Sequence, residues 1–433
     1  MPVNIVVVGG GAGGLELATG LGQRLGRKGT ARITLVDANA THIWKPLLHE
    51  VAAGSMSTSE NEVNYVAQAK WNDFEFQVGR LCAIDRKQRL IHLAPLLDES
   101  SEVVIAQRSL SYDYLVIAIG SKTNDFGTQG AQEHCLFLDT TEQAERFHRQ
   151  LLNHYLGAHA NAYTGANQKI TVGIVGAGAT GVELAAELRN SALELSAYGL
   201  HCIKPEDMHI TILEAGPKVL PALPDRIGGA VQKALAKLNV DVLTSSAVKE
   251  VTAEGFKTHD GTLIPATLKV WAAGICAPAF LKDLGGLEAN RINQLVVRPT
   301  LQTTFDERIY AIGDCAACSL GEGLGNVPPR AQSAHQQASL LVKSFAAQIK
   351  GSTPLTYRYK DYGSLISLSH FTAVGNLMGS VMGSVKVEGW LAKCFYVSLY
   401  RMHQVALFGL VRTGLRVLGD RIGSSTKTRL KLH

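Results

Sequence analysis

Long uncharged apolar runs are missing from this chain, although 46% of its 433 residues are apolar. A bilayer-spanning helix needs about 20 predominantly apolar residues, so we expect no such helix. The first candidate strand begins at about Asn4, and we therefore expect no leader peptide before the fold. The sequence also has no low-complexity tract, which favours an ordinary folded protein. Its length predicts two or three domains.

Cysteine is scarce and scattered. The seven cysteines are odd in number, which argues against a disulfide framework and for a reducing compartment. Only Cys315 and Cys318 form a close pair, with the CxxC spacing of a soft-metal or redox site. Because no further ligands stand at a similar spacing, we expect two ordinary thiols and no metal.

Negative charge is scarce near the end of the chain. The whole sequence carries a net charge of +5, whereas residues 386–433 hold nine Lys or Arg against two acids. That segment is therefore strongly basic and the rest is nearly neutral. We expect no nucleic-acid partner.

A glycine-rich turn follows an apolar strand candidate at residues 5–8. Gly9 permits a tight turn, Gly11 lets the backbone approach a pyrophosphate, and Gly14 lets the next helix pack closely on the strand. A second strand candidate, 32–36, ends in Asp37, at about the offset of a ribose-binding carboxylate. A plain loop opening an α/β domain is the alternative, but the whole pattern predicts a dinucleotide site that includes Ala12 and Gly13.

The same pattern recurs 167 residues later. After a strand candidate at 170–175, the turn contains Gly176, Gly178 and Gly181, and the next strand candidate, 209–213, ends in Glu214. A carboxylate there accepts from both ribose hydroxyls and repels a 2′-phosphate, which favours NADH over NADPH. The repeat predicts an α/β protein with two Rossmann-like dinucleotide-binding domains.

Other segments indicate which turn holds which cofactor. Residues 112–120, with Ala118 and Gly120, and residues 309–314, with Gly313 and Asp314, resemble the segments that close the FAD domain of two-domain flavoprotein reductases. Asp314 as a simple turn residue is the alternative. Residues 270–274, with Ala273 and Gly274, resemble the return segment beside the nicotinamide.

These assignments predict a discontinuous FAD domain with an NADH domain inserted into it. The expected divisions are 1–125 and 293–345 for FAD, 126–164 for a connecting helical segment, 165–292 for NADH, and 346–433 for membrane association or dimerisation. In the connecting segment, Asp139 and Glu142 have the spacing of a capping box, which predicts a helix over 139–155.

The glycine turns do not identify the electron acceptor, which must be inferred from other segments. Disulfide reductases of this architecture resemble one another in a Cys-x4-Cys pair, but no cysteine lies between Gly14 and Cys82. Cys135 and Cys276 could be remnants of a sulfide:quinone reductase, but neither lies in a recognisable motif. Prolines at 328 and 329 precede a helix that starts with small residues and glutamines, over 331–338. Small residues admit a planar ring, and glutamines can bond its carbonyl oxygens, although a plain polar helix start is an equal alternative.

Residues 331–336, Ala-Gln-Ser-Ala-His-Gln, resemble the quinone-site AQxAxQ motif of type II NADH dehydrogenases. Further similar segments are 42–54, 181–185, 271–275, 326–330 and 429–433, so the similarity covers essentially the whole chain and is closest to the enterobacterial kind. The resemblance implies a respiratory NADH:quinone oxidoreductase that uses non-covalent FAD, does not pump protons, and forms a homodimer. It also implies a peripheral place on the cytoplasmic face of the bacterial inner membrane.

The resemblance further implies residue roles. Ala331, Gln332 and Gln336 would border FAD and the quinone, and Lys45 would lie in the cofactor site. The position of Glu183 is implicated in the quinone reaction, although alone it could be an acid favoured by the helix dipole. The remaining alternatives are a soluble NADH-dependent reductase of a protein or metal acceptor, and a non-catalytic redox sensor.

The basic end of the chain also has an amphipathic pattern. Its apolar residues recur in steps of three and four, which predicts one helix or a broken pair of helices. Basic residues interrupt the stripe, as in a helix lying in a bilayer interface, and packing on the core or on a twin subunit is the alternative. The stripe comprises Leu391, Phe395, Leu399, Met402, Val405, Phe408, Val411, Leu415 and Leu418.

Overall fold

The computed structural model describes residues 2–162, 169–197, 204–368, 372–379, 383–388 and 390–423. The 429–433 segment used in the resemblance lies outside the described residues. The side chains of Leu391, Phe395 and Leu399 in the predicted stripe also lie outside them.

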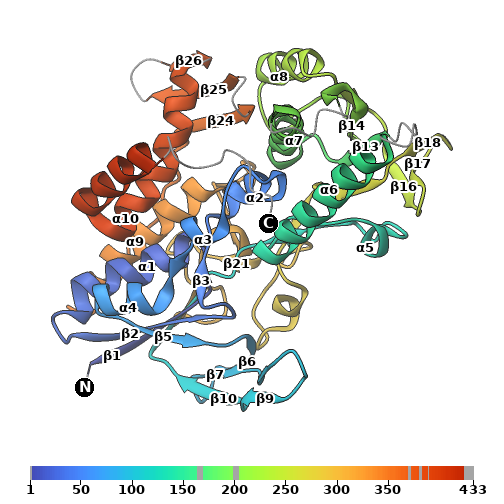
Figure 1. The fold of residues 1–433 in the computed structure, drawn as a ribbon. Coiled ribbons are helices and arrows are strands. Elements are labelled where there is room, and N and C mark those ends of the chain that lie inside the picture. The colour runs from blue at the N-terminus through green and yellow to red at the C-terminus, as the bar shows by residue number, and fades with distance from the viewer. Residues whose placement is uncertain are drawn as a thin grey trace.

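A parallel five-stranded sheet carries the first glycine turn (Figure 1). Its middle strand is buried from Ile5 to Val8, as an apolar run covered on both faces should be. Helices α1 (Ala12–Leu21) and α9 (Ala331–Gln348) pack against each other beside it. The strands, in spatial order, are β22 (Ile309–Ala311), β11 (Tyr114–Ile117), β1 (Val3–Val8), β2 (Ala31–Asp37) and β5 (Glu75–Val78).

A second parallel sheet carries the second turn, and its long helix α7 (Ala179–Ala197) starts directly after that turn. The predicted strands at 170–175 and 209–213 are confirmed, with the second one residue longer at its start. The spatial order is β15 (Val240–Leu243), β14 (Met208–Leu213), β13 (Ile170–Val175) and β19 (Leu268–Trp271). The two sheets and their turns therefore repeat one architecture.

The connecting helix α6 spans Thr141–Ala162, so the predicted range of 139–155 was wrong at both ends. The cap is formed one residue later: Thr140 Oγ1 accepts from the Gln143 N–H at 3.3 Å, and Gln143 Oε1 accepts from the Thr140 N–H at 3.2 Å. Asp139 does not cap the helix because its carboxylate accepts from the backbone N–H of Thr123.

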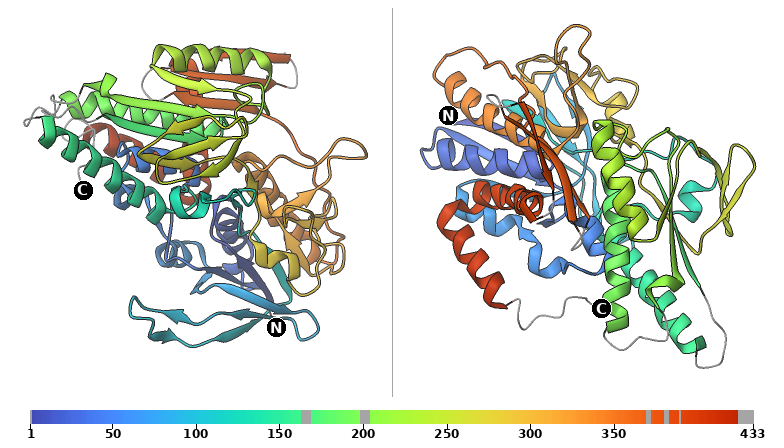
Figure 2. Two further views of the ribbon diagram at one scale, coloured as in Figure 1. Left: turned by 90° about the vertical axis from the view of Figure 1, so that its right-hand side faces the viewer. Right: turned by 90° about the horizontal axis from the view of Figure 1, so that it is seen from above.

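Three antiparallel strands and a kinked helix are the last elements of the described residues. Strands β24 (Gly363–Leu368), β25 (Thr372–Gly379) and β26 (Gly383–Glu388) lie between α10 (Trp390–Gly423) and α7, as Figure 2 shows. Helix α10 also packs on α1. Of the two predicted alternatives, one helix or a broken pair, the structure has the broken pair, because Gly409 has φ 77° and ψ 169° inside α10. In the described part of the chain, no helix is long and apolar enough to cross a membrane.

Smaller sheets and short helices accompany the two parallel sheets. Two further antiparallel sheets contain β6 (Leu81–Asp85), β7 (Leu90–Leu93) and β10 (Arg108–Ser111), and β16 (Val248–Val251), β17 (Gly255–Thr258) and β18 (Leu263–Pro265). Other short elements that border the site are β3 (Thr41–His42), α2 (Leu48–Ala53), α4 (Tyr65–Asn72) and β24.

Candidate functional site

One cavity of about 2130 Å³ is bordered by segments of both sheets and by α9 and α10. It is large enough for more than one ligand, since single ligand pockets are typically about 300–1,000 Å³. Sixteen of the predicted site residues line it: Gly9, Gly11, Ala12, Gly13, Asp37, Lys45, Ala118, Gly120, Gly178, Glu183, Gly274, Gly313, Asp314, Ala331, Gln332 and Gln336. The other five, Gly14, Gly176, Gly181, Glu214 and Ala273, are not part of its lining.

The first glycine turn has the geometry that a dinucleotide needs. Gly9 has φ 103°, and a Cβ on Gly14 would lie 1.8 Å from the Gly9 carbonyl oxygen. A Cβ on Gly11 would meet nothing within 4 Å, so this backbone faces open space. No side chain caps α1, which leaves its first amides available to an anion. The turn therefore fits a pyrophosphate.

Asp37 closes the same turn. Its carboxylate accepts from the Gly10 N–H at 2.6 Å and from the Asn39 N–H at 2.8 Å. Burial raises the pKa of Asp37, and the backbone hydrogen bonds partly offset that effect. The carboxylate is thus fixed at the edge of the cavity, where a ribose hydroxyl could donate to it.

The second turn repeats these contacts. Gly176 has φ 106°, and a Cβ on Gly181 would lie 2.1 Å from the Gly176 carbonyl oxygen. Glu214 accepts from the Ala177 N–H and the Gly216 N–H, both at 2.8 Å. The close packing explains why Gly176 and Gly181 do not line the cavity, whereas Gly178 does.

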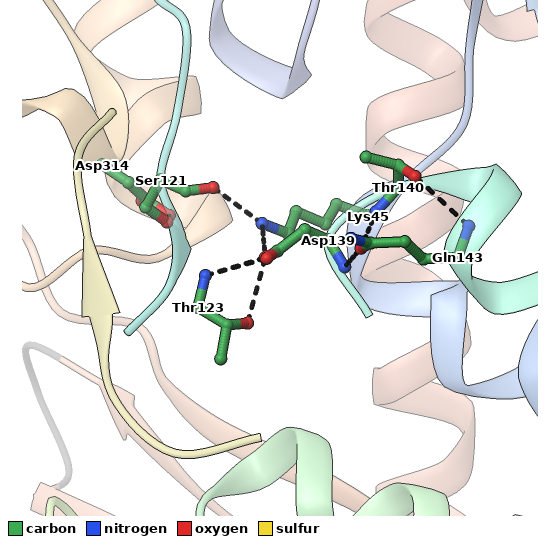
Figure 3. Close-up of polar contacts among 7 residues, drawn as sticks. All are labelled: Lys45, Ser121, Thr123, Asp139, Thr140, Gln143 and Asp314. Carbon is green, nitrogen blue, oxygen red and sulfur yellow. Dashed lines mark hydrogen bonds and ion pairs between the residues drawn. The ribbon is translucent and has the colours of Figure 1, made fainter. Parts of the chain in front are cut away.

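A polar network joins Lys45 to other residues that line the cavity (Figure 3). Lys45 Nζ donates to the Ser121 carbonyl oxygen at 2.8 Å and to Asp139 Oδ1 at 3.0 Å. Ser121 Oγ donates to Asp314 Oδ2 at 2.9 Å, and burial raises the pKa of Asp314. The network thus connects the predicted cofactor residues Lys45 and Asp314 through Ser121, which the sequence did not single out.

The Gly313 turn is held by a buried glutamine. Gln337 Oε1 accepts from the Gly313 N–H at 2.7 Å, and this glutamine is 1% exposed. Its neighbour Cys315 donates to the Ile312 carbonyl oxygen at 3.3 Å, and burial raises the pKa of this thiol to about 12. Burial also raises the pKa of Cys318 to about 11, so both side chains remain thiols at neutral pH.

Glu183 is almost completely buried at the start of α7. Its Oε1 accepts from the Ser367 N–H at 3.0 Å, and its Oε2 lies 3.8 Å from Nδ1 of His49. Burial, with minor contributions from Glu50 and Glu187, raises the pKa of Glu183 to about 8. Burial also lowers the pKa of His49 to about 4. These shifts favour a protonated Glu183 and a neutral His49 at neutral pH.

The two predicted glutamines on α9 bond a neighbouring segment of the chain. The Gln332 amide donates to the Gly363 carbonyl oxygen at 3.1 Å and accepts from the Tyr362 N–H at 3.1 Å. Gln336 makes the same pair of bonds with the backbone of Lys360, at 2.8 Å and 3.0 Å. Both side chains line the cavity while fixing residues 360–363 along its rim.

The sequence analysis missed a second buried glutamate, Glu16 on α1. Its Oε1 accepts from Nδ1 of His403 at 2.7 Å, and its Oε2 contacts Nδ1 of His335. Nε2 of His403 lies 3.2 Å from Nε2 of His42. All four side chains line the cavity. The glycine repeat itself could have revealed Glu16, because it follows Gly14 by two residues, as Glu183 follows Gly181.

Comparison with known proteins gives the family. Residues 3–338 match the model of the pyridine nucleotide-disulphide oxidoreductase family. The chain is 45% identical to a type II NADH:quinone oxidoreductase of Haemophilus influenzae, over 99% of this chain and 100% of that one. It is 26% identical to the type II NADH:quinone oxidoreductase NdhA of Mycobacterium tuberculosis, over 99% of this chain and 90% of that one.

Solved structures show the same fold at low identity. NDH2 from Plasmodium falciparum in complex with NADH has a TM-score of 0.83 at 19% identity, with 100% of both chains covered. The sulfide:quinone oxidoreductase of Aquifex aeolicus has a TM-score of 0.71 at 19% identity, over 97% of this chain and 95% of that one. The fold is thus that of two-dinucleotide-binding flavoproteins. With its full-length relative at 45% identity, the chain belongs to the pyridine nucleotide-disulphide oxidoreductases and, among them, to the type II NADH:quinone oxidoreductases.

Proposed function

We propose that this chain oxidises NADH and reduces a membrane quinone to quinol through FAD. The observation that carries the proposal is that a single cavity is lined by both glycine turns and by the start of α9. Two dinucleotides and a third, planar molecule could then approach one another without leaving the protein. Holding reactants in such an arrangement is the main contribution that a protein makes to cofactor chemistry.

FAD would be held by the first turn. The uncapped α1 amides near Gly11 would take its pyrophosphate, Asp37 its ribose, and the Gly313–Asp314 pair its ribityl and phosphate region. When bound, FAD accepts two electrons as a hydride and passes them on. We assign residues 1–125 and 293–345 to this domain, which agrees with the presence of β22 beside β11 in the first sheet. The supporting residues in this assignment are Gly9, Ala12, Gly13, Gly14, Lys45, Ala118 and Gly120.

NADH would be held by the second turn, within residues 165–292. Gly178 faces open space as Gly11 does, and Glu214 is fixed by two backbone amides. A fixed carboxylate at the ribose favours NADH over the 2′-phosphorylated form by charge repulsion. Ala273 and Gly274 follow β19 directly, and Gly274 lines the cavity.

The quinone would enter beside α9, near Ala331, Gln332 and Gln336. Because the two glutamine amides already bond residues 360–363, we assign them a role in shaping the entry in addition to any contact with the quinone. Glu183 lines the same cavity, and we propose that it lies near the nicotinamide and contributes to the quinone reaction from there.

Residues 346–433 would attach the enzyme to a membrane surface, with 126–164 as the connecting segment. Beyond the kink at Gly409, α10 exposes Leu410, Val411, Leu415, Leu418 and Ile422, each at least 56% accessible. Arg412 and Arg416 lie on the same half of the helix, which suits an interface rich in anionic headgroups. We also propose that the enzyme lies on the cytoplasmic face of a bacterial inner membrane and forms a homodimer. Both of these proposals rest on the sequence resemblance.

The test uses the FAD-loaded full chain, NADH, and a short-chain quinone. We expect NADH-dependent quinol formation and a strong preference for NADH over NADPH. The double variant Val411→Glu, Leu415→Glu should lose binding to anionic vesicles, whereas Leu97→Glu, at an equally apolar exposed position on another face, should keep it. Reduction of a ferredoxin-type protein in place of quinone would favour a soluble reductase. Absence of any turnover would favour a sensor.

A further inference from the structure

A hydrogen-bonded group of four side chains joins three helices and a strand along one wall of the cavity. Glu16 on α1 is the centre, with His335 from α9 on one carboxylate oxygen and His403 from α10 on the other. His42, at the end of β3, contacts His403. Glu16, His403 and His42 are at most 8% exposed, whereas the side chain of His335 is 37% exposed.

The orientation of His335 is defined by Glu16. Because Nδ1 of His335 contacts the carboxylate, Nε2 is the ring nitrogen left for a molecule in the cavity. His335 lines the cavity together with Gln332 and Gln336, its neighbours on the same helix. A carboxylate that orients an imidazole in this way is a recurring arrangement of acid and base catalysis.

Quinone reduction needs a proton from outside the reductant. Conversion of a quinone to a quinol consumes two electrons and two protons, and a hydride from NADH supplies two electrons and one proton. The second proton must therefore come from the protein or from water. A histidine held beside the substrate is a suitable donor near neutral pH.

Resting on the proposed function, we propose that His335 is the catalytic acid that gives this second proton to a quinone oxygen, and that Glu16 is its positioning residue. In this step the Nε2–H bond of His335 breaks and an O–H bond of the quinol forms. His335 becomes neutral and regains a proton from water in the cavity. His403 holds the second oxygen of Glu16, so the place of α10 controls the position of the carboxylate.

The charges around His335 agree with this role. The hydrogen bond to Glu16 raises the pKa of His335 against the effect of burial. Burial opposes ionisation of Glu16, but the bonds from His335 and His403 outweigh it and lower the pKa of Glu16. Burial and His403 lower the pKa of His42 to about 3, so His42 stays neutral. Lys343 and Arg330, at the start of α9, also line the cavity, and Arg330 pairs with Asp361. On α10, Arg401 bonds Gln404 and Asp420, and the further charged residues Arg412 and Arg416 follow the kink.

The test compares two electron acceptors in the FAD-loaded full chain. A quinone takes protons with its electrons, whereas ferricyanide takes electrons alone. His335→Gln keeps a polar group toward Glu16 but cannot transfer a proton at neutral pH. We expect its kcat with quinone to fall about tenfold or more, with ferricyanide turnover, flavin content and NADH-dependent flavin bleaching unchanged. Ser339→Ala, on the next turn of α9 in the same cavity, is the matched control.

The pH profile of quinone turnover distinguishes a catalytic role of His335 from a purely structural one. In Glu16→Gln the pKa of His335 should fall, so the alkaline limb of the quinone rate profile should move to lower pH while flavin content is retained. The proposal would be overturned if His335→Gln lost turnover equally with both acceptors, or if it kept wild-type turnover with quinone. The four side chains would then only hold α10 in place. Absence of quinone turnover in the wild-type chain would instead reject the proposed function.

Discussion

Glu16 and Glu183 hold the same place in the two halves of the molecule, two residues after the last glycine of each turn, yet their protonation differs. Both are almost fully buried. Glu16 receives hydrogen bonds from two imidazoles, which lower its pKa, whereas Glu183 receives one backbone N–H and lies near Glu50 and Glu187, and its pKa rises to about 8. A repeated motif therefore fixes the position of the carboxyl group, and the segments that pack on it decide its charge.

The largest effect should come from the glycines that precede the glutamates. Gly14→Ala and Gly181→Ala each place a Cβ within 2.1 Å of a carbonyl oxygen, so the turn must open. We expect Gly14→Ala to lose FAD during purification, and Gly181→Ala to keep FAD but raise the KM for NADH about tenfold or more. Flavin absorbance and NADH titrations measure the two effects.

Gly157→Ala in α6, where a Cβ meets nothing within 4 Å, is the control and should behave as wild type. If Gly181→Ala lost FAD and Gly14→Ala did not, the assignment of the cofactors to the two turns would be reversed.

Replacement of each glutamate by glutamine should have the next largest effect, and it should lower folding stability at one position far more than at the other. Glu16→Gln removes charge-assisted bonds to two imidazoles and should cost about 2 kcal/mol or more of folding stability at pH 7. Glu183→Gln replaces a protonated acid by a neutral amide and should change stability much less. Thermal unfolding of the FAD-loaded chains measures the difference. Equal losses in the two variants would mean that both carboxyls have the same charge.

Residues close in sequence were predictable, and residues brought from far away were not. The strands, the turns and the positions of Asp37 and Glu214 follow from local apolar runs and glycine spacing. The partners of Glu16, in contrast, lie 319 and 387 residues away, and Ser367 lies 184 residues from Glu183. The sequence could therefore mark Glu183 as a candidate but not its charge.

The start of α6 was predicted wrongly because contacts from distant parts of the chain also decide it. Asp139 and Thr140 are both favourable caps by residue type. Asp139 is bonded by Thr123 and Lys45, which come from other elements, and the cap passes to Thr140. Likewise, the glutamines of α9 were expected to face a quinone, and the bonds to residues 360–363 could be seen only in the fold.

The pH dependence of folding stability should also differ between the two glutamates. The pKa of Glu183 is raised from its ordinary value of 4.5 to about 8, so the unfolded chain loses this proton near pH 4.5 while the folded chain keeps it to about pH 8. Wild-type stability should therefore fall between these pH values, and Glu183→Gln should gain relative to it across the same window. The lowered pKa of Glu16 has the opposite sign, since its stabilisation is lost only as the pH falls below about 4.5. Unfolding temperatures at pH 3, pH 5 and pH 8.5 measure both trends, and a constant difference for Glu183→Gln between pH 5 and pH 8.5 would contradict the assignment.

The smallest effect concerns the carboxylates that end the second strands. Glu214→Gln should keep its bond from the Ala177 N–H but remove the negative charge, and we expect NADPH to compete about tenfold better against NADH. Asp37→Asn, the equivalent change in the first half, should leave this preference unaltered. Ratios of kcat/KM for the two nucleotides measure the effect, and an unchanged ratio in Glu214→Gln would remove Glu214 from nucleotide selection.

The most direct measurement is infrared spectroscopy of the two carboxyl groups at pH 7, because a protonated carboxyl has a C=O stretch that a carboxylate lacks. With the glutamates labelled by carbon-13, the difference spectrum of wild type minus Glu183→Gln should contain this band, and that of wild type minus Glu16→Gln should not. A protonated band lost in Glu16→Gln, or none lost in Glu183→Gln, would contradict the account.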